Sequence, residues 1–146
     1  MPRRATNDFL HGAITSSIIG SMQEAHSELG FGYREHIYSL ALERLLIAKG
    51  HRVGREVAVM VYFRGEPLAT QVLDMVIDDK VAVECKTGRT LHQAATLQLF
   101  GYLCATVLEV GLVLHFGRTA TAHRVFFENR LKKQLPQRSG PTTEIL

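Results

Sequence analysis

The sequence predicts a single α/β domain, in which a mixed sheet of four or five strands is covered by helices on both faces. Its 146 residues suit one domain. The hydrophobic period changes from helical to strand-like after residue 50 and becomes helical again near residue 91. The elements follow the order ααβββαββ. Tight turns make the first three strands antiparallel, and a helical crossover makes the fourth strand parallel to the third, so the sheet is mixed.

Two helices are expected first, over residues 7–29 and 33–49. Asn7 or Asp8 can cap the first helix, and Gly50 follows the second at the usual place for a C-terminal stop. The apolar residues that recur at helical spacing in the first helix are Ile14, Ile18, Ile19, Met22 and Ala25. The stripe that we expect to face the core in the second helix is Ile37, Leu40, Ala41, Leu45 and Ala48.

The strands are recognised by their valine-rich runs and by the turns between them. A turn at residues 64–67 and another at Asp78–Asp79 separate the first three strands. A third helix is expected over residues 91–106. The expected strands cover residues 53–63, 68–77, 80–86, 110–116 and 121–127.

Composition excludes several classes of protein. Apolar residues make up 46% and charged residues 21%, which excludes a disordered chain and a coiled-coil rod. No apolar run of about 18 residues is present, so no membrane span is expected. Two cysteines do not make a disulfide framework, and a reducing, cytoplasmic setting follows as the expectation.

The net charge of +3 is unevenly distributed. The basic excess lies in residues 1–6 and 129–146, whereas residues 7–128 are mildly acidic. We expect a single domain over residues 1–128 and a basic, flexible tail over 129–146. Basic ends can bind a nucleic-acid backbone, and they can equally be plain solubilising segments.

The strand at 80–86 and the strand before it carry the most informative pattern. Along an extended strand Glu84 and Lys86 share one face, and Cys85 lies on the other. This strand should be buried on both faces, and buried charges are costly unless they are paired or bind a metal. Asp74 lies across a tight turn and can approach Glu84. Two adjacent carboxylates repel each other, and oxygen ligands suit Mg²⁺ or Mn²⁺.

A plainer interpretation fits the same residues. Lys86 could form a structural ion pair with Glu84 or with Asp74 at the strand end, without a metal. The strand pattern alone leaves both interpretations open.

Two motifs give the chain a family resemblance. Asp74 with the later Glu84–Cys85–Lys86 resembles the signature of the PD-(D/E)XK nuclease superfamily. Residues 32–38 resemble the motif that names the GxxExxY family, a branch of that superfamily. Further matching segments follow in order at residues 73–76, 79–81, 83–86, 98–103 and 111–117. The resemblance implies a restriction-endonuclease-like core.

The resemblance also implies roles for individual residues. Asp74 and Glu84 would be metal-binding carboxylates, with Glu35 as an additional acidic ligand. Lys86 would hold or help to deprotonate the attacking water. Gln98 would line the site from the crossover helix. The implied cofactor is Mg²⁺ or Mn²⁺.

The function expected from this resemblance is a metal-dependent phosphodiester hydrolase that acts on DNA, with RNA as the second choice. The alternative is a catalytically silent module on the same fold that binds nucleic acid or takes part in an oligomeric assembly, because a fold does not determine function. A homodimer is expected, since cutting a duplex needs a site for each strand.

Overall fold

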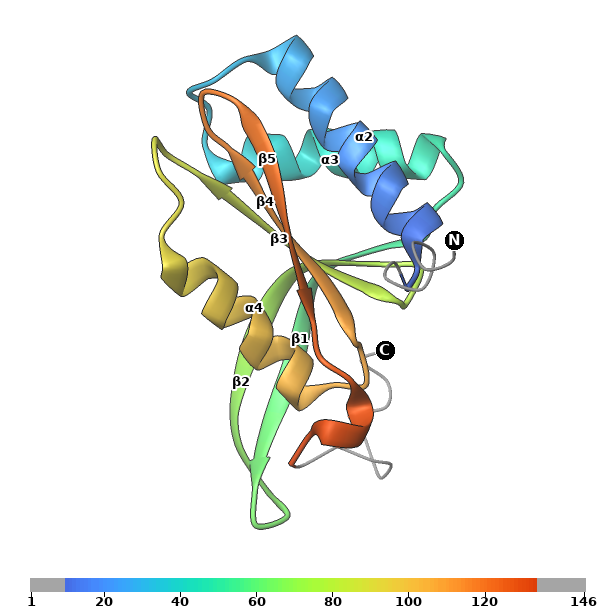
Figure 1. The fold of residues 1–146 in the computed structure, drawn as a ribbon, viewed down its shortest axis with the longest axis vertical. Helices are drawn as coiled ribbons and strands as arrows, with labels where there is room; N and C mark the ends of the chain where they lie inside the picture. The colour runs from blue at the N-terminus through green and yellow to red at the C-terminus, as the bar shows by residue number, and fades with distance from the viewer. Residues whose placement is uncertain (1–9, 134–146) are drawn as a thin grey trace, which may run out of the picture.

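A five-stranded mixed sheet forms the centre of residues 10–133, the part of the chain that the computed structural model describes (Figure 1). The strands are β1 (Val53–Phe63), β2 (Glu66–Ile77), β3 (Val81–Thr87), β4 (Val110–Phe116) and β5 (Ala120–Phe126). The helices are α2 (Gly12–Leu29), α3 (Glu35–Ala48), α4 (Gln93–Ala105) and the short 3₁₀ helix η1 (Asn129–Leu131).

The topology confirms the predicted mixed sheet. The strands lie side by side in chain order from β1 to β5. Neighbouring strands are antiparallel except β3 and β4, which are parallel and are connected through α4. The five predicted strands all form, with boundaries within two residues of the prediction.

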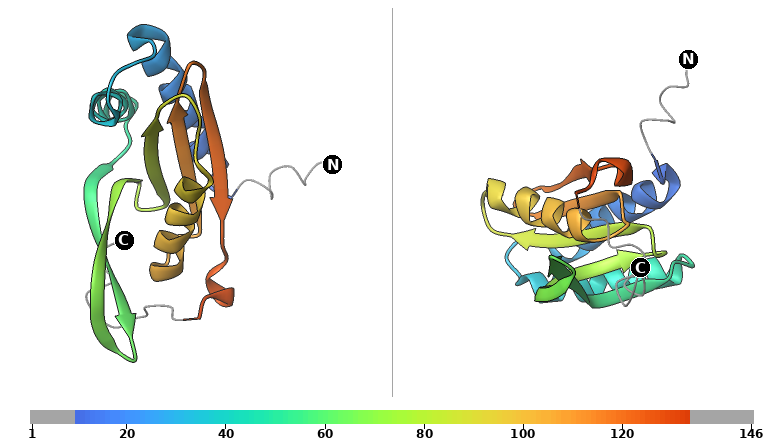
Figure 2. Two further views of the ribbon diagram at one scale, coloured as in Figure 1. Left: turned by 90° about the vertical axis from the view of Figure 1, so that its left-hand side faces the viewer. Right: turned by 90° about the horizontal axis from the view of Figure 1, so that it is seen from below.

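Helices cover both faces of the sheet, as predicted (Figures 1 and 2). Helices α2 and α3 pack on one face, where Val83 and Cys85 of β3 belong to the core. Helix α4 packs on the opposite face, against Ala82 of β3 and Val113 of β4. Strand β3 is therefore buried on both sides, and any polar side chain on it needs a specific reason to be there.

The first helix begins at Gly12 in the described residues, and its expected caps, Asn7 and Asp8, lie outside them. The predicted core stripe of α3 is only partly right: Ala41 and Leu45 pack against the core, but Ile37, Leu40 and Ala48 are exposed. The helix instead buries Tyr38, Ser39, Leu42 and Leu46. The reason is aromatic packing, since the Tyr38 ring stacks on Phe116 of β4 with ring centroids 4.4 Å apart and thereby sets the rotation of the helix.

The described fold continues past residue 128, where we expected the tail to begin. Helix η1 follows β5, and the buried ammonium of Lys132 donates hydrogen bonds of 2.7 Å to the carbonyls of Thr106 and Leu108. Burial lowers the pKa of Lys132 to about 8. Thr106 is the C-cap residue of α4, so this lysine satisfies one carbonyl that the helix end leaves without a partner and a second one in the loop that follows.

The β1–β2 hairpin separates from the rest of the sheet at one point. Strands β1 and β2 pair along nearly their whole length, but β2 pairs with β3 only as far as Met75 opposite Val83. Beyond that pair the hairpin continues away from the sheet, as Figure 1 shows. The next residues after the last pair are Asp74 and Glu84, so the two acids lie at the fork between β2 and β3.

No helix within residues 10–133 is long and apolar enough to cross a membrane.

A pair of glycine substitutions tests the packing of α4 on the sheet. A Cβ at Gly111 would lie 2.8 Å from Cδ2 of the fully buried Leu99, whereas a Cβ at Gly20 meets nothing within 4 Å. We expect Gly111→Ala to lower the free energy of unfolding by about 1–3 kcal/mol through overpacking. Gly20→Ala, in a helix, should raise it by about 0.5–1 kcal/mol. Urea unfolding measures both, and an unchanged stability in Gly111→Ala would contradict the packing described.

Candidate active site

Asp74 and Glu84 lie on adjacent strands, one position beyond the last β2–β3 pair. The Asp74 carboxylate is held at the fork by a hydrogen bond of 2.8 Å, which its Oδ2 accepts from the backbone N–H of Cys85. That N–H would otherwise have lost its strand partner where the hairpin departs. The two acids are therefore neighbours, as the hairpin between their strands predicted, and the Cys85 amide is the group that holds Asp74 in place.

Glu84 is a buried carboxylate with incomplete pairing. The residue is only 4% exposed, and its Oε2 lies 3.6 Å from the ammonium of Lys86. Its Oε1 is buried and has no hydrogen-bond partner among the described residues. Burial, with the Asp74 charge as the second cause, raises the pKa of Glu84 to about 7, and the Lys86 charge opposes the shift. The structural ion pair between Lys86 and Glu84 is thus formed, but it leaves Oε1 of Glu84 without a partner.

Lys86 is held between the sheet and the crossover helix. Its side chain is 25% exposed, and its ammonium donates a hydrogen bond of 3.3 Å to Oε1 of Gln98 on α4. Gln98 itself is exposed at the helix surface. The structure therefore brings Gln98 to the lysine, where it can orient the ammonium.

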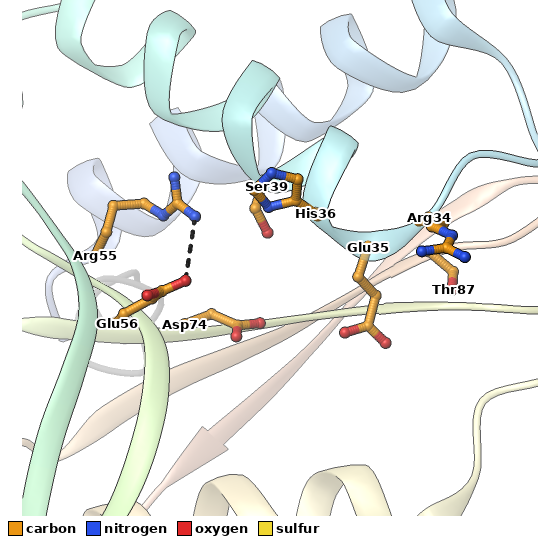
Figure 3. Close-up of a pocket in the computed structure, with 8 residues that line it drawn as sticks. All are labelled: Arg34, Glu35, His36, Ser39, Arg55, Glu56, Asp74 and Thr87. Carbon is orange, nitrogen blue, oxygen red and sulfur yellow. Dashed lines mark ion pairs between the residues drawn. The ribbon is translucent and has the colours of Figure 1, made fainter.

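Glu35 approaches the fork from the first turn of α3. It lines an open pocket of about 440 Å³ together with Asp74, and Figure 3 shows both side chains extending into the space between α3 and the strands. The side chain lies at an exposed rim, yet partial desolvation raises the pKa of Glu35. Lys86 lowers that pKa and Asp74 raises it. The remaining lining residues are Arg34, His36, Ser39, Arg55, Glu56 and Thr87.

Glu56 is a site residue that the sequence analysis missed. It lies on β1 directly opposite Asp74, between the pairs Arg55–Met75 and Val57–Leu73. Its φ of 52° is left-handed, a conformation that costs a non-glycine residue energy in the middle of a strand. Its carboxylate lies 3.8 Å from the Arg55 guanidinium, the ion pair drawn in Figure 3. Nothing in a valine-rich strand pattern signals such a kink.

The fork fits a divalent cation with few protein ligands. Within residues 10–133, no three His, Cys, Asp or Glu side chains form a ready-made metal-binding group. Mg²⁺ needs no such cage, because it usually binds one or two carboxylates and keeps several waters. The unpartnered oxygen of Glu84 beside Asp74 supplies that donor set.

Two tyrosines near the site serve packing. Tyr38 is fully buried under α3, and Tyr102 on α4 donates its hydroxyl hydrogen to the carbonyl of Val72. This hydrogen bond of Tyr102 connects the crossover helix α4 to the β1–β2 hairpin. Cys85, on the face opposite Glu84, is fully buried, and burial raises its thiol pKa to about 12, so it is inert.

A family model, described as the PD-(D/E)XK nuclease superfamily, matches residues 12–126. The chain belongs to the PD-(D/E)XK nuclease superfamily. The matched range contains the whole fork, and the mixed sheet with its flanking helices is the restriction-endonuclease-like fold of that superfamily. Members generally use divalent metal ions such as Mg²⁺ and act on nucleic acids.

Comparison with individual proteins adds less. No curated protein matches the chain. Seven chains of solved structures do, and one of them is the protein of "Crystal structure of SSO0001", with 19% sequence identity and a TM-score of 0.49. That match covers 64% of this chain and 50% of the other chain.

The raised pKa of Glu84 predicts a pH dependence of stability in a metal-free buffer. The folded state binds the proton more tightly than the unfolded state, whose carboxyl titrates near 4.5. Stability is therefore highest below pH 4.5 with respect to this group and falls as the pH rises toward 7. The shift corresponds to roughly 3 kcal/mol.

Urea unfolding between pH 4.5 and 8 in EDTA checks this prediction. Glu84→Gln has no proton to lose and should remove most of the decline, the rest coming from the raised pKa of Glu35, whereas the exposed Glu66→Gln should retain all of it. Parallel pH profiles for wild type and Glu84→Gln would contradict the burial and repulsion described.

Proposed function

We propose that the protein is a metal-dependent nuclease whose active site is the fork between β2 and β3. The observation that carries the proposal is the buried Glu84 oxygen without a partner, directly beside the Asp74 carboxylate. A buried carboxylate oxygen without a partner, next to a second carboxylate, destabilises the folded protein, whereas a cation-binding site uses both groups. Membership in the nuclease superfamily supports the same reading.

Asp74 and Glu84 would hold the cation, and Glu35 would reach it from the pocket rim. A bound Mg²⁺ or Mn²⁺ lowers the pKa of water and stabilises negative charge on a phosphate. Asp74 is fixed by the Cys85 N–H and Glu84 by the buried strand, so neither carboxylate needs to reorganise when a cation arrives.

Lys86 would act on the phosphate side of the site. Its ammonium lies close enough to Glu84 to hold the attacking water or to stabilise the charge that develops on the phosphate. Gln98 is a positioning residue in this scheme, because it acts on the reaction through its hydrogen bond to Lys86.

The proposal includes the substrate, the branch of the superfamily, the cellular compartment and the oligomeric state. DNA is the first candidate substrate and RNA the second. The placement in the GxxExxY branch is supported by the motif at residues 32–38, whose Glu35 lines the pocket and whose Tyr38 is a core residue. The two free cysteines support a reducing compartment such as the cytoplasm. A homodimer stays a prediction.

Two observations favour the catalytically silent alternative. Lys86 already pairs with Glu84, and the described residues hold no group of three His, Cys, Asp or Glu side chains that could bind a metal ion. A module that only binds nucleic acid would keep its affinity when either residue is replaced, and that affinity would fall as salt rises.

Cleavage of labelled single- and double-stranded DNA and RNA separates the two functions. We expect wild-type protein to cut with Mg²⁺ or Mn²⁺ and to be inactive in EDTA. Glu84→Gln and Lys86→Met should each lose roughly 100-fold or more in rate, because each removes a charge at the reacting phosphate.

The matched controls are exposed residues of the same types. Glu66→Gln and Lys80→Met lie away from the fork and should cut like wild type. Thermal melting shows that each variant is folded. A folded wild-type protein that cuts none of the four substrates with either metal would refute the nuclease proposal.

A further inference from the structure

Two aromatic side chains are exposed immediately before the candidate active site. Phe31 is 44% exposed and Tyr33 is 50% exposed, both in the loop that connects α2 to α3. Glu35 of the pocket follows two residues later. Large aromatic rings left in solvent beside a functional pocket provide surfaces on which a flat ligand can stack.

The loop that carries these rings is held in place. The buried Tyr38 donates its hydroxyl hydrogen to the carbonyl of Gly30 and accepts a 3.3 Å hydrogen bond from the N–H of Tyr33. Gly30 and Gly32 have φ values of 78° and 120°, which a residue with a side chain rarely adopts. The rings are thus presented by a fixed backbone, which reduces the entropy lost when a ligand binds.

The loop of the two rings and two further loops near the candidate site carry exposed arginines. The loops at residues 30–34, 88–92 and 117–119 contain Arg34, Arg89 and Arg118, all exposed, and no aspartate or glutamate. We call these three arginines with Phe31 and Tyr33 the aromatic rim.

Contacts between the loops join the rim into one surface. The Arg118 guanidinium lies 5.7 Å from the centroid of the Phe31 ring. His115 donates its Nε2 hydrogen to the Gly88 carbonyl at 2.8 Å, which holds the loop of Arg89 against the end of β4.

The aromatic rim opens onto the carboxylates. Arg34 lines the same pocket as Glu35 and Asp74, and Figure 3 shows it beside Thr87 at the end of β3. Thr87 follows Lys86 directly. A chain whose bases lay on Phe31 and Tyr33 would therefore have its phosphates next to the proposed reaction centre.

We propose that the aromatic rim binds unpaired bases, so that the substrate is a single strand or the unpaired end of a duplex. This inference rests on the proposed nuclease function and specifies its substrate class. Bases inside a duplex are already stacked on one another and have no free face for a side-chain ring, whereas bases in a single strand do. The arginines would contact the phosphates in either form. A single-stranded substrate also needs only one site, so it does not require the dimer.

Binding without metal tests the proposal. Fluorescence anisotropy in EDTA would compare wild-type protein with the double variant Phe31→Leu/Tyr33→Leu on an oligonucleotide of about 16 nucleotides. Single strand and blunt duplex are both measured, as DNA and as RNA. Leucine keeps the apolar contacts of the loop but removes the ring face.

The expected result is a loss of single-strand affinity on the order of tenfold or more in the double variant, with duplex affinity unchanged. The matched control is Phe63→Leu, because Phe63 is also exposed, at 52%, and also lies under an arginine, Arg64, but at the tip of the β1–β2 hairpin. This control should bind like wild type. The DNA and RNA arms tell which sugar the site accepts.

Two results would overturn the proposal: unchanged single-strand affinity in the double variant, or an equal loss on single strand and duplex. The nuclease proposal fails in a different way.

If single strands bind through the rings but are not cut with metal, the aromatic rim is a binding surface and the nuclease proposal is wrong. If the protein cuts with metal but binds independently of the rings, the nuclease proposal stands and the proposal on the aromatic rim is wrong.

Discussion

The hydrogen bond from the Cys85 amide to the Asp74 carboxylate is the interaction on which the candidate site depends. The β1–β2 hairpin leaves β3 at this point, and the Asp74 side chain takes over the role of the missing strand partner. Pairing further along the strands would satisfy the amide through the backbone and close the fork. A local defect in the sheet thus becomes the place where a carboxylate is fixed.

The burial of Glu84 puts an incompletely paired negative charge at the fork. A carboxylate on a strand covered on both faces is destabilising unless something neutralises it, and Lys86 does so only through one oxygen at 3.6 Å. The cost is high because Val83 and Cys85, its neighbours on β3, are fully buried apolar residues. The raised pKa of Glu84 reflects this cost, and stability lost in this way is what we expect if the fork is the active site that we propose.

Sequence reasoning succeeded where a periodic pattern or a turn decided the outcome. The five strands, the crossover helix and the facing of Glu84 away from Cys85 all follow from period and parity. It failed where a single tertiary contact decided. The stacking of Tyr38 on Phe116 turns α3 so that Ile37 and Leu40 of the predicted stripe are exposed, and Glu56 has a left-handed backbone opposite Asp74 that no local pattern encodes. The exposed state of Phe31 and Tyr33 likewise depends on the fixed loop rather than on composition.

The most direct test of the account is an NMR titration of the Glu84 carboxyl carbon, with and without Mg²⁺. We expect a pKa of about 7 in the metal-free protein, because the carboxylate is buried beside Asp74. This pKa should fall markedly when Mg²⁺ is added, since a cation favours the charged form. A carboxyl that titrates near 4.5 and does not respond to Mg²⁺ would contradict both the buried charge and the cation site.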